Sequence, residues 1–288
     1  MFSKSKTAIL ASTLIIISSI SKATLADLNT GIIAHWDFND CTAKDITGSG
    51  YDGTIDGPVQ CVNGINGKAL SFVSTGAVHV PALPAIVNNG FSGCAWASYK
   101  DNNNWGSLFD FGNGAYADNI ALIRDQTSNK LLYLYQDLNS TISDGKITNN
   151  QWQLFCVTVN NASHTAKLYA NGKLVGSNTN HQIPNILRSS NFLGNNNWNE
   201  QFHGLLDEVS IWDRALSSTE INQLYIKDSP LTGNLKGSGN YTVTCTNTVT
   251  NQTITLPVQT ANYWDCSAAG LQLNHKQPYH ISIDGVAD

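Results

Sequence analysis

Charge is scarce in this sequence, and glutamate is scarcer. Only 13% of the 288 residues are charged, and no stretch gathers lysine and arginine into a basic cluster. Binding to phosphate backbones needs such a cluster, so nucleic acid is not expected as a partner. Glutamate occurs only at Glu200, Glu208 and Glu220. The motifs HExxH and GxSxG and a phosphate-binding glycine loop are also missing, which removes several enzyme classes.

Long apolar runs are absent after the first 26 residues. Met1–Ala26 has basic Lys4 and Lys6, an apolar and hydroxyl-rich run at Ala8–Ile20, and small residues at Thr24-Leu25-Ala26. This order is typical of a cleaved signal peptide, and the run is short for a membrane span. An uncleaved anchor is the alternative. We expect a secreted or extracellular protein (periplasmic or cell-surface in a bacterium) with no transmembrane anchor after cleavage.

Cysteine pairs of the CxxC type are missing as well. The six cysteines therefore do not indicate a zinc ribbon or a thioredoxin-like site. An even number of cysteines in an exported chain favours disulfides, although the count alone allows many pairings. Removal of the signal segment with its three lysines changes the formal net charge from −5 to −8.

Short strands with alternating apolar residues fill the region from residue 31 to residue 225. Ile32, Ala34, Trp36 and Phe38 share one face of the first strand, and Asn171-Gly172 predicts a two-residue hairpin turn. Further strands are expected at Lys68–Val73, Ala77–Val80, Phe91–Tyr99, Leu108–Phe111, Asn119–Arg124, Leu131–Gln136, Trp152–Val159, Ala166–Tyr169 and Lys173–Gly176. The pattern predicts an all-β, two-sheet antiparallel sandwich.

The stretch Gly204–Tyr225 predicts a strand, a corner and one short helix. Alternation places Leu205, Asp207, Val209 and Ile211 on one strand face, where the Asp207 carboxylate needs a cation or hydrogen-bond donors. Ser217 and Glu220 then have the spacing of a capping box, and the apolar positions Ile221, Leu224 and Tyr225 follow at helical spacing.

This stretch resembles the closing strand and helix of LamG-like jelly-roll domains. These laminin-G and pentraxin relatives belong to the concanavalin A-like lectin/glucanase superfamily, and the shared pattern is a glycine, an apolar-Asp-Glu-Val strand, an aromatic residue, the turn RALS and a helix ending in tyrosine. The resemblance covers roughly Gly31–Tyr225 and implies a jelly-roll fold. It does not specify a ligand.

The resemblance also implies a disulfide pairing. Cys94 and Cys156 lie in segments similar to the two pentraxin strands that carry that family's disulfide, and we expect this bridge to join the two sheets. Cys41–Cys61 would then close an N-terminal loop, and Cys245–Cys266 a C-terminal one.

The composition changes near residue 229. Residues 1–26 are read as the signal peptide, 27–228 as the jelly roll, 229–240 as a linker rich in glycine and serine, and 241–288 as a small β-rich region held by its disulfide. Strands are expected there at Tyr241–Thr246, Thr253–Val258 and His280–Ile283.

Glycoside hydrolysis needs two carboxylates that flank one bond. The related glucanases carry Glu-x-Asp-x-x-Glu on one strand, and none of the glutamates here has that spacing. We therefore expect no catalytic residues. A pair such as Asp110 and Asp118 is the enzymatic alternative.

Calcium is a second hypothesis, because oxygen ligands on loops at a sandwich rim suit this ion and relatives bind it there. The candidate ligands are Asp45, Asp52 and Asp207. The competing interpretation is that Asp207 accepts backbone N–H bonds and that the loop around Asp45 is a turn.

Glycan binding is the third hypothesis. Two loops, Asp101–Trp105 and Asn195–Asn199, combine asparagines with a tryptophan, and an aromatic face with nearby amides suits a sugar ring. Trp105, Trp198, Tyr116 and Asp118 are the candidate ligand-binding residues, although asparagine also favours turns and tryptophan often packs.

Together these patterns predict a secreted, non-catalytic binding or adhesion module for a glycan or an extracellular protein. A carbohydrate-active enzyme of the same fold and a structural surface or matrix protein are the alternatives. The oligomeric state stays open.

Overall fold

The computed structural model describes residues 28–73, 75–83, 90–101, 105–125, 130–135, 142–198, 200–228, 232–234, 239–258, 263–266 and 279–287. The expected signal segment and most of the expected linker lie outside the described residues. The described residues between 28 and 228 belong to one compact unit, and the described residues from 232 onward belong to another. None of the helices in the described part has the length and apolarity needed to cross a membrane.

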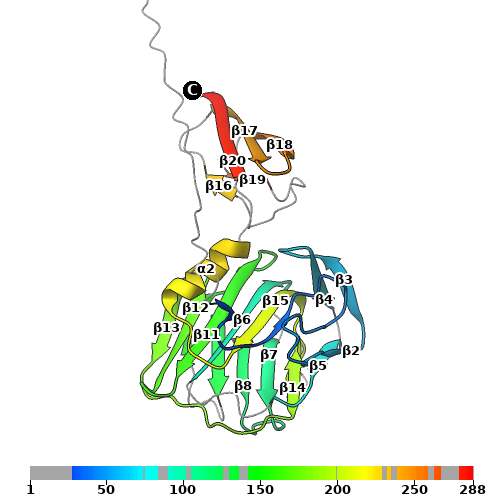
Figure 1. The fold of residues 1–288 in the computed structure, drawn as a ribbon, viewed down its shortest axis with the longest axis vertical. Coiled ribbons are helices and arrows are strands. Elements are labelled where there is room, and N and C mark those ends of the chain that lie inside the picture. The colour runs from blue at the N-terminus through cyan, green and yellow to red at the C-terminus, as the bar shows by residue number, and fades with distance from the viewer. Residues whose placement is uncertain are drawn as a thin grey trace, which may run out of the picture. The chain divides into compact units, whose positions relative to one another are not determined.

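The larger unit is a sandwich of two antiparallel sheets (Figure 1). The first sheet has the order β13-β12-β11-β6-β15-β4-β3, and β1 also pairs with β15. Its strands are β1 (Ile32–Trp36), β3 (Val59–Asn63), β4 (Lys68–Phe72), β6 (Gly90–Tyr99), β11 (Gln153–Asn160), β12 (Thr165–Ala170), β13 (Lys173–Asn178) and β15 (Gly204–Trp212).

The second sheet has the order β10-β9-β8-β7-β14-β5-β2. Its strands are β2 (Thr54–Asp56), β5 (Ala77–Val80), β7 (Ser107–Gly112), β8 (Ile120–Asp125), β9 (Lys130–Tyr135), β10 (Ile142–Lys146) and β14 (Ser190–Leu193). The predicted jelly-roll sandwich is confirmed. The short strands β2, β3, β10 and β14 were not predicted.

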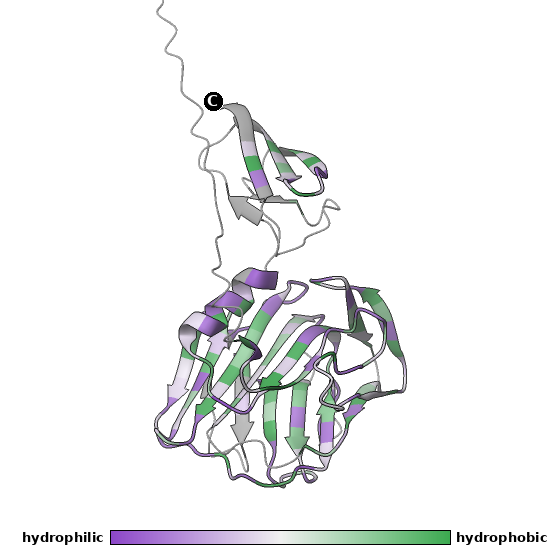
Figure 2. Cartoon of the chain, viewed as in Figure 1, coloured by the Kyte–Doolittle hydropathy of each residue, from purple (hydrophilic) through white to green (hydrophobic). Residues whose placement is uncertain are grey.

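One apolar core lies between the two sheets. Phe72 and Val157 enter it from the first sheet, and Phe109 and Leu122 enter it from the second. Apolar and polar residues alternate along many strands (Figure 2), as expected when one face of each strand is buried. The hairpin at Asn171-Gly172 forms as predicted, with both residues at positive φ.

Helix α2 (Ser218–Asp228) covers the outer face of the first sheet. The capping box is confirmed: Glu220 N donates to Ser217 Oγ (3.2 Å), and Ser217 N donates to Glu220 Oε2 (2.8 Å). Ile221 is buried, and Tyr225 stacks on Trp96 with ring centroids 5.8 Å apart.

The Cys94–Cys156 disulfide lies in the same outer layer beneath the helix. The pairing is the expected one, but the bridge does not join the two sheets. Cys94 and Cys156 stand directly opposite each other on the neighbouring strands β6 and β11. The bridge therefore fixes one strand pair within the first sheet.

A β-bulge in β15 overturns the predicted strand faces. The register with β6 shifts between Asp207 and Ser210, and Glu208 has a φ of 50°. Because the bulge inserts an extra residue, the face changes at this point. Leu206 therefore joins Val209 and Ile211 in the core, whereas Leu205 is only half-buried and Asp207 lies outside the apolar cluster.

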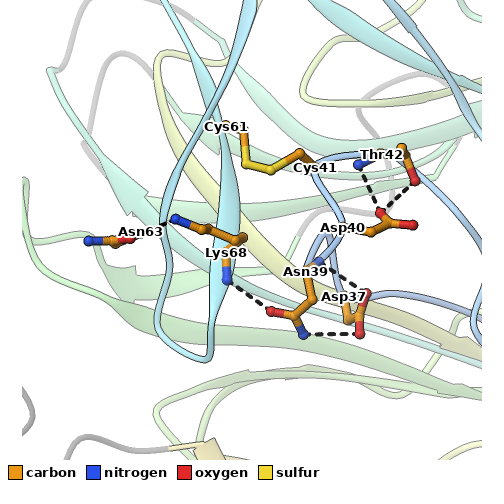
Figure 3. Close-up of a disulfide and its surroundings, with 8 residues drawn as sticks. All are labelled: Asp37, Asn39, Asp40, Cys41, Thr42, Cys61, Asn63 and Lys68. Carbon is orange, nitrogen blue, oxygen red and sulfur yellow. Dashed lines mark hydrogen bonds between the residues drawn. A yellow bond between two sulfur atoms is a disulfide. The ribbon is translucent and has the colours of Figure 1, made fainter. Parts of the chain in front are cut away.

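The Cys41–Cys61 disulfide ties the loop after β1 to strand β3 (Figure 3). Asp40 accepts hydrogen bonds from Thr42 N (2.9 Å) and Thr42 Oγ1 (2.6 Å) in this loop. Lys68 N donates to Asn39 Oδ1 (2.9 Å), which links the loop to β4. Both cysteines of this bridge are exposed.

The smaller unit contains a sheet of order β18-β17-β20 and the strand pair β16–β19. Val243 and Cys245 are buried on β17, and Cys245 forms the expected bridge to Cys266. The bounds of its strands are β16 (Thr232–Asn234), β17 (Gly239–Asn247), β18 (Thr253–Val258), β19 (Tyr263–Asp265) and β20 (Tyr279–Ala287). The strands β16 and β19 were not predicted.

Candidate functional site

The candidate site lies on the outer face of the second sheet, over β7 and β8. Phe109 and Leu122 belong to the sandwich core, whereas Ala121 and Ile123 form a separate small cluster on the other face. Asp110 pairs directly with Ala121 in the strand register. Because side chains at directly paired positions share a face, Asp110 belongs to the outer face as well.

Two loops bring aromatic rings to this face. We call them the Tyr116 loop (residues 113–119, between β7 and β8) and the Trp198 loop (residues 194–198, after β14). The rings of Tyr116 and Trp198 meet edge to face with centroids 5.4 Å apart. Trp105 and Trp198 are half-buried against Ala121 and Ile123, while Tyr116 is 65% exposed.

Three of the four predicted ligand-binding residues are therefore gathered in one place. Tyr116 offers an exposed aromatic ring, and Trp198 and Trp105 form an apolar base beneath the loops. The predicted loop residues 102–104 and 199 lie outside the described part of the chain.

Asp118, the fourth predicted residue, lies at the end of the Tyr116 loop. Its Oδ2 accepts a hydrogen bond from Asn113 Nδ2 (3.3 Å), and its main-chain oxygen accepts one from Arg188 Nε (2.8 Å). Tyr116 and Asp118 have φ values of 60° and 59°, in the left-handed region that is uncommon for tyrosine. The loop thus holds Tyr116 in a strained conformation of the kind that clusters at ligand sites.

Asn196 fixes the two tryptophans in relation to each other. Its Nδ2 donates to Trp105 O (3.2 Å) and Ser107 Oγ (2.9 Å), and its Oδ1 accepts from Trp198 N (3.0 Å) and Glu200 N (2.9 Å). This amide is nearly fully buried. It therefore positions the aromatic base and is not free to contact a ligand.

Asp110 is the residue of this site whose position the sequence did not indicate. Its carboxylate is fully buried and accepts hydrogen bonds from both loops. Oδ1 accepts from Asn119 Nδ2 (3.0 Å), and Oδ2 accepts from Asn119 Nδ2 (3.2 Å), Asn197 N (2.8 Å) and Asn197 Nδ2 (2.9 Å). Burial raises the pKa of Asp110 to about 6, although these donors act in the opposite direction.

The catalytic pair considered from the sequence is not supported by this geometry. Asp110 is 0% exposed and accepts hydrogen bonds from Asn119 and Asn197, so it does not face a substrate. A glycosidase needs both carboxylates at the scissile bond.

The three candidate calcium ligands do not form one site. Asp45 accepts from His35 N (3.1 Å), Thr47 Oγ1 (2.7 Å) and Tyr51 N (3.2 Å), and Asp52 accepts from Asp45 N (2.8 Å). Burial acts to raise the pKa of Asp45, but these donors outweigh it and the pKa is lowered. In the described ranges no group of three His, Cys, Asp or Glu residues could hold a metal ion.

The Asp207 carboxylate accepts backbone N–H bonds, which was the alternative to calcium binding. It accepts from Ile65 N (3.0 Å), Asn66 N (3.2 Å) and Glu208 N (2.8 Å). Burial and the neighbouring Glu208 carboxylate raise the pKa of Asp207 to about 9 despite these donors. Calcium binding stays a prediction.

Glu208, at the bulge, is the centre of a separate polar cluster. Its side chain contacts His35 Nε2 (2.9 Å), Asn66 Nδ2 (3.1 Å) and Lys227 Nζ (3.5 Å). Burial acts to raise the pKa of Glu208, but the His35 hydrogen bond and the Lys227 charge outweigh it and hold the pKa at about 2. The cluster ties helix α2 to β15 and β1.

The sandwich topology and the closing strand with its helix define a jelly-roll protein of the lectin and glucanase type. A laminin-G-type family model, described as the concanavalin A-like lectin/glucanases superfamily, matches residues 72–222. The chain belongs to this superfamily. No curated protein matches it.

Similar solved structures share the fold at low sequence identity. Domain 4 of AbnA, an extracellular GH43 arabinanase from Geobacillus stearothermophilus in complex with arabinotriose, is 24% identical with a TM-score of 0.59, covering 67% of this chain and 98% of that domain. The ganglioside-dependent botulinum neurotoxin type C is 18% identical (TM-score 0.54; 83% and 64% covered). Trypanosoma rangeli sialidase is 15% identical (TM-score 0.54; 68% and 33% covered). Binding domains and glycosidases thus share this fold, which leaves catalytic activity open.

Proposed function

We propose that this protein is a secreted, non-catalytic carbohydrate-binding module that recognises a glycan on the outer face of its second sheet. The observation that carries the proposal is the pairing of exposed Tyr116 with Trp198 above an aromatic and amide-rich base. An exposed aromatic ring offers a stacking face for a sugar, and the loop amides hold that ring and Trp198 in place.

Three further points support this proposal. The similar AbnA domain holds arabinotriose, and the similar neurotoxin depends on gangliosides for cell entry. The three disulfides fit an oxidising, extracellular, periplasmic or cell-surface location. The expected cleavage after Ala26 is checked by intact-mass analysis of the exported protein, which should begin at Asp27.

The test is a glycan array followed by calorimetry with the best oligosaccharide. The Tyr116→Ala variant should bind about fivefold to tenfold more weakly, since an aromatic contact contributes about 1 kcal/mol. Leu174→Ala is the matched control, because Leu174 is also an exposed apolar side chain (53%) but lies on β13 of the other sheet. Equal losses in both variants, or none in Tyr116→Ala, would contradict this site.

The same experiment separates binding from catalysis. Chromatography of the incubated oligosaccharide should show the starting material unchanged. Released sugar in the incubation with the wild type would instead support the enzymatic alternative.

A further inference from the structure

One buried carboxylate connects the two loops of the proposed binding site. Asn119 ends the Tyr116 loop and Asn197 lies in the Trp198 loop, and both donate to Asp110. Each amide is also bound within its own loop region. Asn119 Oδ1 accepts from Ala117 N (2.9 Å), and Asn197 Oδ1 accepts from Ser190 Oγ (2.5 Å). The relative position of the two aromatic rings therefore depends on Asp110.

We propose that ionised Asp110 is a positioning residue that clamps both loops, so that mild acid releases the Tyr116 loop and weakens glycan binding. The effect on glycan binding rests on the proposed function. The change in the Tyr116 loop does not, because it should also occur in the protein without a ligand.

The two oxygens of the carboxylate are not equivalent. Oδ2 accepts from Asn197 N, from Asn197 Nδ2 and from Asn119 Nδ2, whereas Oδ1 accepts from Asn119 Nδ2 alone. A proton is therefore best placed on Oδ1, where it displaces the fewest donors. The new O–H then faces the N–H of Asn119, and two donors cannot pair with each other.

Relief of this conflict changes the Tyr116 loop and leaves the other loop attached. If the Asn119 amide turns its oxygen toward the new O–H, it gives up the bond from Ala117 N. If it moves away, the link to Asp110 is lost. Either change loosens the turn that holds Tyr116 at a φ of 60°. Asn197 still donates to Oδ2, so Trp198 stays in place.

In the described part of the chain, the groups that donate to the Asp110 carboxylate are amides, and none of them is a cation. Phe192 on β14 and Ala121 on β8 stand opposite it in the register. The titratable and charged groups on the packed elements are His79, whose ring contacts Phe192 (4.8 Å), Asp118 and Arg188 beside the Tyr116 loop, and Glu200 after the Trp198 loop. With no cation on the carboxylate, burial keeps the pKa of Asp110 near 6, which supports the clamp as a switch at mildly acidic pH.

The direction of the Asp110 pKa shift distinguishes loop release from unfolding of the protein. The pKa is raised above its ordinary 3.8, so the folded chain takes up the proton more readily than the unfolded chain. This group therefore adds stability as pH falls from about 6 toward 4. The fold should persist while the loop changes.

The first experiment needs no ligand. The protein has seven tryptophans, so the fluorescence of Trp198 must be isolated from that of the others. It is obtained by subtracting the emission of the Trp198→Phe variant from the emission of the wild type at each pH. This signal should change with a midpoint near pH 6 in the wild type. Asp110→Asn, which presents an amide N–H to the same donors, should lack the transition and resemble the acid form at every pH.

The controls change other ionisable groups. Asp40→Asn changes an exposed carboxylate far along the sequence, and His79→Gln removes the imidazole that contacts Phe192. Both should keep the transition. If Asp110→Asn does not fold, Asn119→Ala takes its place, since it removes the donor to Oδ1 and should abolish the transition. A transition that survives in these Asp110 or Asn119 variants, or no transition in the wild type, overturns the clamp.

The second experiment measures affinity for the oligosaccharide found on the array. One pH unit below the pKa about one molecule in ten keeps Asp110 ionised, so the apparent Kd should rise by about fivefold and at most about tenfold. Asp110→Asn should bind weakly at neutral and acidic pH alike. A fluorescence transition without binding of any glycan would reject the proposed function and keep the clamp. A Kd that changes neither with pH nor in the Asp110→Asn variant would reject the clamp and leave the proposed function intact.

Discussion

Mild reduction of the native protein should open one of its disulfides first, namely Cys41–Cys61. Both cysteines of this bridge are exposed, whereas Cys94 and Cys156 are 2% and 0% exposed beneath helix α2. Thiol–disulfide exchange needs a thiolate to reach a sulfur atom, so access controls the rate. The Cys245–Cys266 bridge of the smaller unit is buried as well and should follow later.

The bridges should also differ in their contribution to the free energy of unfolding. Cys41 and Cys61 are 20 residues apart, and Cys94 and Cys156 are 62 apart. The chain-entropy relation gives about 3 kcal/mol for the shorter loop and about 4 kcal/mol for the longer one. Loss of the buried bridge also removes packing next to Trp96, so this difference should widen.

Two assays check these expectations. Partial reduction followed by alkylation and peptide mapping should label Cys41 and Cys61 before any other cysteine. Urea unfolding should then rank the double variant Cys41→Ala/Cys61→Ala as more stable than Cys94→Ala/Cys156→Ala. Labelling of Cys94 as early as Cys41, or the reverse stability order, would refute the reasoning from exposure and loop length.

Further predictions concern the helix cap, a crowded glycine, a buried acid and calcium. Glu220→Ala removes both the capping box and the ion pair with Arg214 (2.6 Å), and should lower the urea-unfolding free energy by about 1–2 kcal/mol. Gly194→Ala should cost roughly 2 kcal/mol or more in the same assay, because Gly194 has a φ of 70° and an added Cβ would overlap the ring of Phe72. The pKa of Glu208 is lowered from 4.5 to about 2, so its stabilisation is present above pH 4.5 and lost toward pH 2. Glu208→Gln should flatten that part of the stability–pH curve. The carboxylates Asp45, Asp52 and Asp207 already accept N–H bonds, and calorimetry tests whether they also bind calcium. If they do, the melting temperature should be higher in calcium than in a chelator; equal melting temperatures would contradict the calcium prediction.

The elements that the sequence predicted best are those with local signals. The cap at Ser217 and Glu220 and the turn at Asn171-Gly172 each depend on residues within a few positions of one another, and both form. The jelly roll was implied by the resemblance of the closing strand and helix to LamG-like domains. Edge strands of three to five residues, such as β2 and β3, carry too little alternation to be predicted.

The prediction of which side chains of β15 face the core was wrong for a physical reason. Alternation assumes a period of two, and one inserted residue reverses every face beyond it. Nothing in the letters of the strand marks Glu208 as the residue at positive φ, since glutamate is not a residue that favours this conformation. The bulge is stabilised by distant partners, His35 and Lys227, which pair with the Glu208 carboxylate.

The sequence predicted several residues of the candidate site, but not how the loops bring them together. The aromatic residues Tyr116 and Trp198 were expected at a ligand site, yet their contact depends on two loops 82 positions apart. Asp110 was considered only as a member of a catalytic pair and not as a buried link between loops, because an acidic residue between apolar neighbours on a strand normally faces water. Only the loop amides that cover it turn the outer face into a buried one.

The scarcity of charge in this chain has a structural counterpart at Asp110. A lysine or arginine at the position of Asn119 or Asn197 would neutralise the carboxylate and lower its pKa, but a cation donates hydrogen bonds and accepts none. An amide does both. Asn119 donates to Asp110 while it accepts from Ala117 N, and Asn197 donates to Asp110 while it accepts from Ser190 Oγ. Each asparagine thus satisfies the carboxylate and its own loop region together, and it leaves the charge of Asp110 uncompensated. The same amides that hold the loops therefore leave Asp110 able to take up a proton at mildly acidic pH, which a salt bridge would prevent.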